Sequence, residues 1–202
     1  MNDLSAKISE LYECHAQHYD LDRSRNLAVE KRWLDRFISL APSRGTVLDI
    51  GCGHGEPIAM YLMSQGFKVA GVDSSPSLIA LCRKRFPTHE WLTADMRTLE
   101  IGQSFHGLLA WDSLFHLCHE DQRRMFPIFR MHAASGAPLM FTSGPTHGES
   151  IGSYHGEPLY HASLSAEEYS LLLESNGFFV RAHVVEDAES GRHTVWLAQF
   201  SK

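Results

Sequence analysis

The sequence predicts a single α/β domain, residues 1–202, with a doubly wound, mostly parallel seven-stranded sheet and a C-terminal antiparallel hairpin. Between residues 46 and 142, short apolar or β-branched runs alternate with helical patterns, as in a parallel sheet with helices on both faces. The last two predicted strands, 178–185 and 193–200, are separated only by a polar, glycine-containing turn, which favours a hairpin. A chain of 202 residues can bury one substantial core and is short for two.

Each element follows from a local pattern. The N-terminal part is expected to hold a helix over 4–19, a polar loop over 20–26 and a helix over 29–40 that ends at Ala41-Pro42. The remaining strands are expected at 46–50, 67–72, 90–93, 107–111 and 138–142, and the helices at 57–65, 75–85, 120–134 and 165–176. Pro127 lies inside one of these helices, so a kink or break is expected there.

Composition limits the classes of function. The net charge of −6 gives no reason to expect a polyanionic partner, and the short Arg/Lys pairs fall on predicted helices, so nucleic acid is an unlikely ligand. Four scattered cysteines without a C-x-x-C motif indicate reduced thiols. The chain starts without an apolar signal core and has no apolar run near the roughly 20 residues that span a membrane, so we expect a cytoplasmic protein with no membrane partner.

A glycine loop follows the strand predicted at 46–50. Gly51, Gly53 and Gly55 lack Cβ atoms, so a ligand can approach the backbone N–H groups and the N-terminus of the next helix. Structural turns use glycines as well. The dinucleotide fingerprint G-x-G-x-x-G would require a third small residue, where this chain has Glu56 or Ile58, so an NAD-dependent reaction is disfavoured. The P-loop lysine is also missing.

The run from Asp49 to Gly55 resembles the first motif of the class I S-adenosylmethionine-dependent methyltransferases, an acid followed by three alternating glycines. The resemblance covers residues 8–200 in element order, and its specific motifs lie between 46 and 118. It implies the Rossmann-like methyltransferase fold, S-adenosyl-L-methionine as cofactor and S-adenosyl-L-homocysteine as product. It also implies that the loop, including Cys52, lies beside the amino-acid part of the cofactor. Asp49 would organise the loop or receive the cofactor's ammonium group through water.

Two further acids match the same family. Asp73, followed by Ser74, stands where the family holds the ribose hydroxyls; the alternative is a cap for the next helix. Asp95 stands where the family binds the adenine amino group, and Met96 would pack on the ring; the alternative is a polar turn acid. Three acids at successive strand ends suit a ligand that carries an ammonium and a sulfonium group.

The segment 110–117 resembles the family's fourth motif, which lies beside the methyl donor. Trp111 is expected to line the cofactor site, and Phe115 is expected to line the substrate site. Asp112 and His116 are the polar candidates at the reacting centre, with His116 as the candidate base. Transfer by in-line displacement needs an aligned nucleophile and, for a protonated acceptor, a proton acceptor. The alternative for His116 is a packed or helix-capping side chain.

Residues 144–163 have no clear period and are longer than a passive connection, so we predict a substrate-side flap. Its candidate residues suit a small polar or aromatic acceptor: His147, Tyr154 and Tyr160 as substrate contacts, and His155 as a second catalytic candidate. A glycine-rich surface loop is the alternative. His147-x-Glu149 raises the possibility of a metal, but no i,i+4 His pair or His-x-His occurs in this segment, so no metal site is predicted.

Residues 1–28 also resemble the family, in which a tyrosine, a Tyr-Asp pair and an arginine cover the cofactor. Tyr12, Tyr19-Asp20 and Arg23 or Arg25 match that pattern; we name Tyr19 and Arg25 as cofactor contacts, with an exposed arginine as the alternative. The predicted function is methyl transfer to a small-molecule acceptor. The alternatives are a non-catalytic S-adenosylmethionine-binding protein, acting as a sensor or as a subunit that needs a partner, and a nucleotide-dependent enzyme of similar layout.

Overall fold

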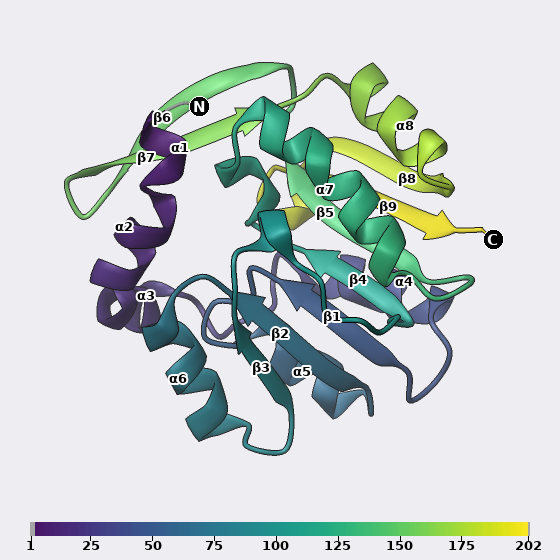
Figure 1. The fold of residues 1–202 in the computed structure, drawn as a ribbon, viewed down its shortest axis with the longest axis horizontal. Coiled ribbons are helices and arrows are strands. Elements are labelled where there is room, and N and C mark those ends of the chain that lie inside the picture. The colour runs from purple at the N-terminus through teal and green to yellow at the C-terminus, as the bar shows by residue number, and fades with distance from the viewer. Residues whose placement is uncertain (1–2, 202) are drawn as a thin grey trace.

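The computed structural model describes residues 3–201 and confirms the predicted sheet. Seven strands lie in the order β3-β2-β1-β4-β5-β9-β8 (Figure 1). Their bounds are β1 Thr46–Ile50, β2 Lys68–Asp73, β3 Glu90–Thr93, β4 Gly107–Ala110, β5 Pro138–Ser143, β8 Phe178–Asp187 and β9 His193–Phe200. Strands β1 to β5 pair in parallel, whereas β9 is antiparallel to both β5 and β8. In the C-terminal hairpin, β9 therefore lies next to β5, and β8 forms the edge of the sheet.

Alternation along β1 assigns its side chains to two cores. Val47 packs in the core on one face of the sheet, and Leu48 and Ile50 pack in the core on the other. All three side chains are fully buried, which explains why this strand reads as a continuous apolar run. Asp49 shares the face of Val47 and is the one acid in this buried strand.

Helices cover both faces (Figure 1). Their bounds are α4 Lys31–Leu40, α5 Ile58–Ser64, α6 Pro76–Arg85, α7 His119–His132 and α8 Ala166–Ser175, with 3₁₀ turns η1 Met96–Thr98, η2 Leu114–His116 and η3 Ala188–Ser190. α4 and α5 pack on one face, with Leu34 and Leu62 in the core of Val47, and α7 and α8 pack on the other. α7 continues through Pro127 without the break that the sequence suggested, because buried Phe126 and Phe129 hold it against the sheet.

Two segments differ from the sequence-based expectation. The single helix expected over 4–19 is three short helices, α1 Asp3–Ala6, α2 Ile8–Cys14 and α3 Ala16–Asp22, and the last one extends into the expected loop. The segment 144–163 contains a regular antiparallel hairpin, β6 Gly148–Tyr154 and β7 Glu157–Ser163, which forms a sheet of its own. β6 is exposed along most of its length, so it shows no alternation of apolar and polar residues.

The N-terminal helices and this hairpin lie together above the carboxyl edge of the main sheet (Figure 1). α1 and α2 both contact β7, although more than 100 residues separate them in sequence. Within residues 3–201, none of the helices combines the length and the apolar character that crossing a membrane requires.

Candidate active site

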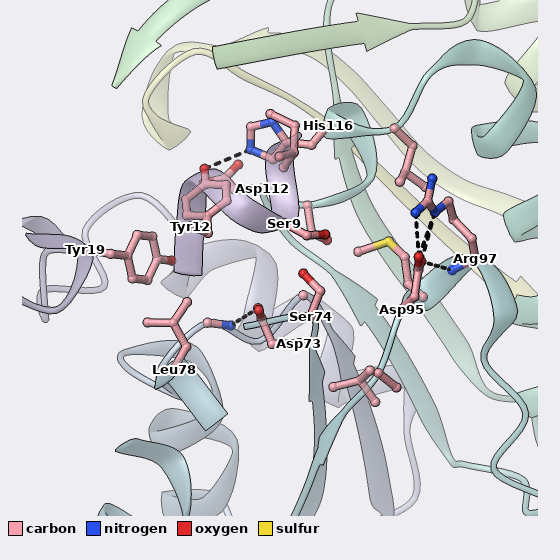
Figure 2. Close-up of a pocket in the computed structure, with 18 residues that line it drawn as sticks. Ser9, Tyr12, Tyr19, Asp73, Ser74, Leu78, Asp95, Arg97, Asp112 and His116 are labelled. Atoms are coloured by element: carbon pink, nitrogen blue, oxygen red, sulfur yellow. Dashed lines mark hydrogen bonds and ion pairs between the residues drawn. The ribbon is translucent and has the colours of Figure 1, made fainter. Parts of the chain in front are cut away.

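A cavity of about 720 Å³ lies at the carboxyl ends of β1, β2, β3 and β4 (Figure 2). The side chains that line it come from the N-terminal helices, the glycine loop, the ends of β2 and β3, and the segment after β4. They include Tyr12, Tyr19, Gly51, Gly53, Asp73, Ser74, Asp95, Met96, Arg97, Asp112, Ser113 and His116. Ligands of open α/β sheets bind at this edge, so the cavity stands where the topology predicts a site.

The glycines of the loop serve two different purposes. Gly51 has a φ of +77°, and a Cβ there would lie 2.3 Å from Ser113 Cβ; Gly53 has a φ of +56°, and a Cβ there would lie 3.0 Å from the Tyr19 ring. Both face the cavity. Gly55 does not line it, and a Cβ there would lie 3.1 Å from Phe86. Gly55 therefore serves the packing of the loop on the core.

Asp73 ties the end of β2 to the glycine loop. Its Oδ2 accepts from Gly53 N at 2.9 Å, and its Oδ1 accepts from Ser75 N at 2.9 Å. Burial raises the pKa of Asp73, and these backbone hydrogen bonds oppose that rise. The cap of α6 is Ser75, whose Oγ accepts from Leu78 N at 3.2 Å. The capping alternative thus belongs to Ser75, and Asp73 faces the cavity.

Asp95 is the turn acid that the alternative predicted, and it also lines the cavity. It is the N-cap of η1, and its carboxylate forms an ion pair with Arg97, 2.5 Å between Oδ2 and Nη2 (Figure 2). Although burial opposes it, hydrogen bonding to Arg97 lowers the pKa of Asp95. Arg97 also reaches Asp121 at 3.3 Å. Asp95 is therefore a turn acid that also forms part of the cavity wall, next to Met96.

A second cavity, about 900 Å³, adjoins the first and shares Tyr12, Tyr19, Gly51, Asp112 and His116 with it. The residues that line the second cavity but not the first come from the N-terminal segment, β1, the glycine loop and α5, the segment after β4, strand β7 and the start of β9. They are Arg23, Asp49, Cys52, Glu56, Ile58, Trp111, Phe115, Leu159, His161 and His193. The predicted residues Asp49, Cys52, Trp111 and Phe115 therefore meet in this second cavity.

Asp49 has an unusual electrostatic environment. Its side chain is 3% exposed, and burial together with the nearby Asp73 carboxylate raises its pKa to about 7, whereas Arg23 acts in the opposite direction. At neutral pH the carboxyl group is therefore poised between its two forms. A cation that entered the cavity would favour the ionised form.

His116 is held by two segments from outside the main sheet. Its Nδ1 lies 2.9 Å from the Tyr160 carbonyl oxygen, which can only accept, so Nδ1 carries the proton. Its Nε2 then accepts from the Tyr12 hydroxyl at 3.0 Å (Figure 2). Burial lowers the pKa of His116 to about 4, so the imidazole is neutral at physiological pH.

Several predicted residues lie outside these two cavities. Arg25 bonds Asp20 at 2.6 Å and lies 3.6 Å from Glu56, whereas Arg23 of the same segment lines the second cavity. The Arg23 guanidinium is 2.6 Å from Glu30, whose side chain is fully buried. Between the two arginines that the sequence offered, the structure places Arg23 at the cavity.

The predicted residues of the flap also separate. His155 and Tyr154 stand at the hairpin turn and bond Asp22 at 2.8 and 3.3 Å, outside both cavities. The Tyr160 side chain is fully buried, and only its carbonyl oxygen reaches His116. His147 lines a third cavity of about 810 Å³ that shares Phe115 with the second. The hairpin therefore contacts the site through β7, and its turn binds the N-terminal helices through Asp22.

Sequence reasoning missed Arg97 and His193 as residues of the cavity walls, whereas His161 lies in the predicted flap and does line the second cavity. His193 is the first residue of β9, which pairs antiparallel with β5, so its start lies at the carboxyl edge of the parallel strands. A polar residue at the start of a strand that reverses direction in the sheet was the signal available for His193.

Among residues 3–201, Asp20, His54 and Glu56 form one group with the spacing of metal ligands. His54 Nδ1 accepts from Glu56 N at 3.2 Å, so its proton sits on Nε2, the atom that faces Asp20 at 3.8 Å. Arg85 pairs with both carboxylates, at 2.6 Å to Asp20 and 3.2 Å to Glu56. The group is an ion-pair network that joins α3 to the glycine loop, and it offers no imidazole lone pair to a metal.

Residues 47–136 match the model of a methyltransferase domain family. An O-methyltransferase of Pyrenophora dematioidea is 28% identical over 169 residues, which cover 76% of this chain and 62% of that protein. A dTDP-3-amino-3,6-dideoxy-α-D-glucopyranose N,N-dimethyltransferase of Streptomyces fradiae is 29% identical over 121 residues, covering 59% and 46%. The solved structure of 1,6-didemethyltoxoflavin-N1-methyltransferase of Burkholderia thailandensis superposes with a TM-score of 0.76 at 17% identity, covering 98% of this chain and 89% of that one.

Over this segment the chain is similar to the methyltransferase domain family, and its fold is that of solved S-adenosylmethionine-dependent methyltransferases. The matched segment runs from β1 to the loop after α7, so it contains the glycine loop, Asp73, Asp95 and Asp112. It excludes the N-terminal helices and the β6–β7 hairpin. The chain spans less than two thirds of the length of these two curated relatives.

Proposed function

We propose that this chain transfers the methyl group of S-adenosyl-L-methionine to a small-molecule acceptor. One observation carries the proposal: the glycine loop and the acids at the ends of β1, β2 and β3 open on two adjoining cavities that share a wall. The first cavity is available to the donor together with the part of the second that Arg23 and Asp49 line, and the rest of the second extends toward the hairpin. The curated relatives named above act on small molecules by their names, which supports the same class here.

The residues present fit the cofactor. Gly51 and Gly53 line the first cavity without a Cβ, so Ser113 and Tyr19 can pack close to the loop, and the Asp73 carboxylate next to them has the chemistry to accept from two vicinal hydroxyls. We assign the adenine end to Asp95 and Met96. We assign the carboxylate of the amino-acid part to Arg23, and its ammonium group to Asp49, because a buried acid next to that cation gains a partner.

The bound cofactor supplies an electrophilic methyl group, and the wall that the two cavities share is where an acceptor atom would meet it. Tyr12, Asp112 and His116 belong to both cavities. We assign Phe115 and Trp111 to the apolar wall of the acceptor side. His116 is neutral and has a pKa of about 4, so it is a weak base. We therefore propose that it positions the Tyr12 hydroxyl at the shared wall and does not remove a proton from the acceptor.

Calorimetric titration with S-adenosylhomocysteine tests the donor site. Asp73→Ala should weaken binding by about 1–3 kcal/mol, the cost of losing hydrogen bonds to a charged group. Asp22→Ala is the matched control, because Asp22 is an exposed acid that bonds His155 outside both cavities, and it should bind like the wild type. Absence of both heat and thermal stabilisation with the wild-type chain would contradict the cofactor assignment.

A further inference from the structure

A carboxylate–imidazole pair stands on the acceptor side of the site. His193 Nε2 lies 3.0 Å from Asp112 Oδ1, and His193 Nδ1 lies 2.6 Å from the Ser190 carbonyl oxygen. The imidazole ring packs over Trp111 with the ring centroids 5.3 Å apart. Both residues of the pair line the second cavity, and Asp112 lines the first as well.

The hydrogen bonds define the charge of the pair. A carbonyl oxygen and a carboxylate both accept, so both nitrogens of His193 donate, which makes the ring an imidazolium. The bond to Asp112 raises the pKa of His193 against the effect of burial, and Glu30 adds to the rise. The charged side chains nearest to the pair on the cavity wall are Arg23, which is bound to Glu30, and Asp49.

Asp112 is fixed in position. Its φ is +51°, and its backbone N–H donates to Thr142 Oγ1 at 2.8 Å. Its side chain is 36% exposed, so carboxylate lone pairs that His193 does not use remain accessible from the cavity. The positive φ of Asp112 strains the backbone, and contacts with β5 and with His193 hold the residue in that conformation. Such strain is often found at functional sites.

The cavity offers an acceptor no unpaired cation. Arg23 is paired with Glu30, and His193 is paired with Asp112. The other polar groups on this wall are the neutral His116 and His161, beside the aromatic Phe115 and Trp111. An anionic acceptor would therefore lie beside the Asp112 carboxylate with no cation left to pair with it. A hydroxyl acceptor would need a base, yet His116 is a weak one and His193 is already protonated.

We infer that the acceptor is an amine, that Asp112 receives its N–H group, and that His193 is a positioning residue for Asp112. The inference rests on the proposed function and names its acceptor class. The ammonium form of the acceptor first releases a proton to solvent, which gives the neutral amine. Its nitrogen then forms a bond to the methyl carbon as the carbon–sulfur bond breaks, and the electron pair of that bond stays on sulfur. Positive charge moves from sulfur to nitrogen, where the Asp112 carboxylate stabilises it. The methylated ammonium then releases one proton to solvent.

A matched panel tests the acceptor class. Benzylamine, benzyl alcohol and benzoate share one skeleton and differ in charge and base requirement; each is incubated with the chain and methyl-labelled S-adenosylmethionine. We expect label in benzylamine only, and Asp112→Asn should reduce that transfer at least about tenfold while S-adenosylhomocysteine affinity stays within about twofold. Asn is chosen because it has the shape of Asp and tolerates a positive φ. Asp22→Asn, at the Asp22–His155 pair outside both cavities, is the matched control and should transfer like the wild type.

Label in the alcohol or in benzoate, or no label in any of the three from a chain that binds S-adenosylhomocysteine, overturns the amine assignment. Failure to bind S-adenosylhomocysteine overturns the proposed function instead, so the two failures are distinguishable.

The pair itself is tested without turnover. In a nitrogen-detected NMR titration, His193 should titrate above the ordinary value of about 6.5, and Asp112→Asn should lower its pKa because the carboxylate partner is lost. His193→Gln, which keeps one donor, should retain more transfer than His193→Phe. A His193 that titrates at the same pH in both proteins, or equal transfer by the two His193 variants, overturns the positioning role.

Discussion

The donor side and the acceptor side of the site are built in different ways. On the donor side, Asp49, Asp73 and Asp95 lie at or near the carboxyl ends of β1, β2 and β3, and Gly51 and Gly53 form the wall with backbone alone. On the acceptor side, side chains distant in sequence make the contacts: Tyr12 with His116, and Asp112 with His193. A site made from strand ends and backbone leaves a spaced motif in the sequence. A site made from long-range side-chain contacts leaves isolated polar residues.

The same difference appears in how far the match to the methyltransferase domain family extends along the chain. The matched segment, residues 47–136, carries the donor side almost completely. Arg23, Tyr12, His161 and His193 come from outside it. Substitutions on the donor side should therefore change cofactor binding, whereas substitutions in the outlying segments should change it little unless they reach the cavity.

The largest effect is expected at Gly51. In Gly51→Ala, the new Cβ would lie 2.3 Å from Ser113 Cβ at a φ of +77°, so the loop must shift. Affinity for S-adenosylhomocysteine, measured by calorimetry, should fall by more than about 100-fold, which corresponds to about 3 kcal/mol. Gly102→Ala is the matched control, since Gly102 has a φ of +76° and nothing within 4 Å of its Cβ position. Equal binding by the two variants would contradict the placement of the loop.

The next largest effect distinguishes the two arginines. Arg23→Gln combined with Glu30→Gln keeps the pair polar without leaving Glu30 as an unpaired buried charge. Affinity should fall about 10- to 100-fold, as expected for the loss of a charge-assisted hydrogen bond of about 1.5–3 kcal/mol. Arg25→Gln, outside both cavities, should change affinity by less than about threefold. If Arg25→Gln lost more affinity than the Arg23→Gln, Glu30→Gln double variant, Arg25 and not Arg23 would be the cofactor contact.

A smaller effect is expected from pH. Because the pKa of Asp49 is raised to about 7, the free protein holds this carboxyl protonated below that pH, whereas a bound ammonium group favours the ionised form. Affinity for S-adenosylhomocysteine should therefore rise as the pH increases from 5 to 7, by at most about tenfold per unit, and level off above 7. For the same reason, the contribution of Asp49 to stability falls as pH rises from about 4 to about 7.

Calorimetry of wild type and Asp49→Asn across this range isolates the group, because the variant has no carboxyl to titrate there. The slope should be shallower for Asp49→Asn. An identical pH dependence for both proteins would show that the ammonium group binds elsewhere.

The smallest effect is expected at the hairpin turn. His155 is exposed and reaches Asp22 outside both cavities, so His155→Ala should leave cofactor affinity and methyl transfer within about twofold. A transfer rate that fell tenfold in a labelled-methyl assay, with cofactor affinity unchanged, would restore His155 as a catalytic candidate and move the acceptor side toward the turn.

Much of the fold could be predicted because its strands carry strong local signals. Thr46–Ile50 is a buried β-branched run, and Ser165 with Glu168 marks a helix start that the structure places at Ala166. The β6–β7 hairpin could not be predicted, because exposed β6 has no alternation and its glycines suggested a loop. The three-way division of the N-terminal helix also left no clear pattern.

The candidate site divides in the same way. Asp73 and Asp95 could be placed because each follows a predicted strand. Arg97 could not, since its role depends on a contact with Asp121 that sequence spacing does not reveal. His193 depends on the position of β9 in the sheet, which is known only once the strand order is known.

The two hydrogen bonds of His116 have a consequence for mutagenesis. One imidazole joins η2 to α2 through Tyr12 and to β7 through the Tyr160 carbonyl. Removing it releases two independent segments at once, so lost activity in His116→Ala would report loosened assembly as readily as lost chemistry. Tyr12→Phe removes one of the two links and leaves the imidazole in place. Comparing Tyr12→Phe with His116→Ala therefore separates the two contacts. Loss of transfer already in Tyr12→Phe would identify the contact with α2 as the important one, and loss only in His116→Ala would identify the contact with β7 or the imidazole itself.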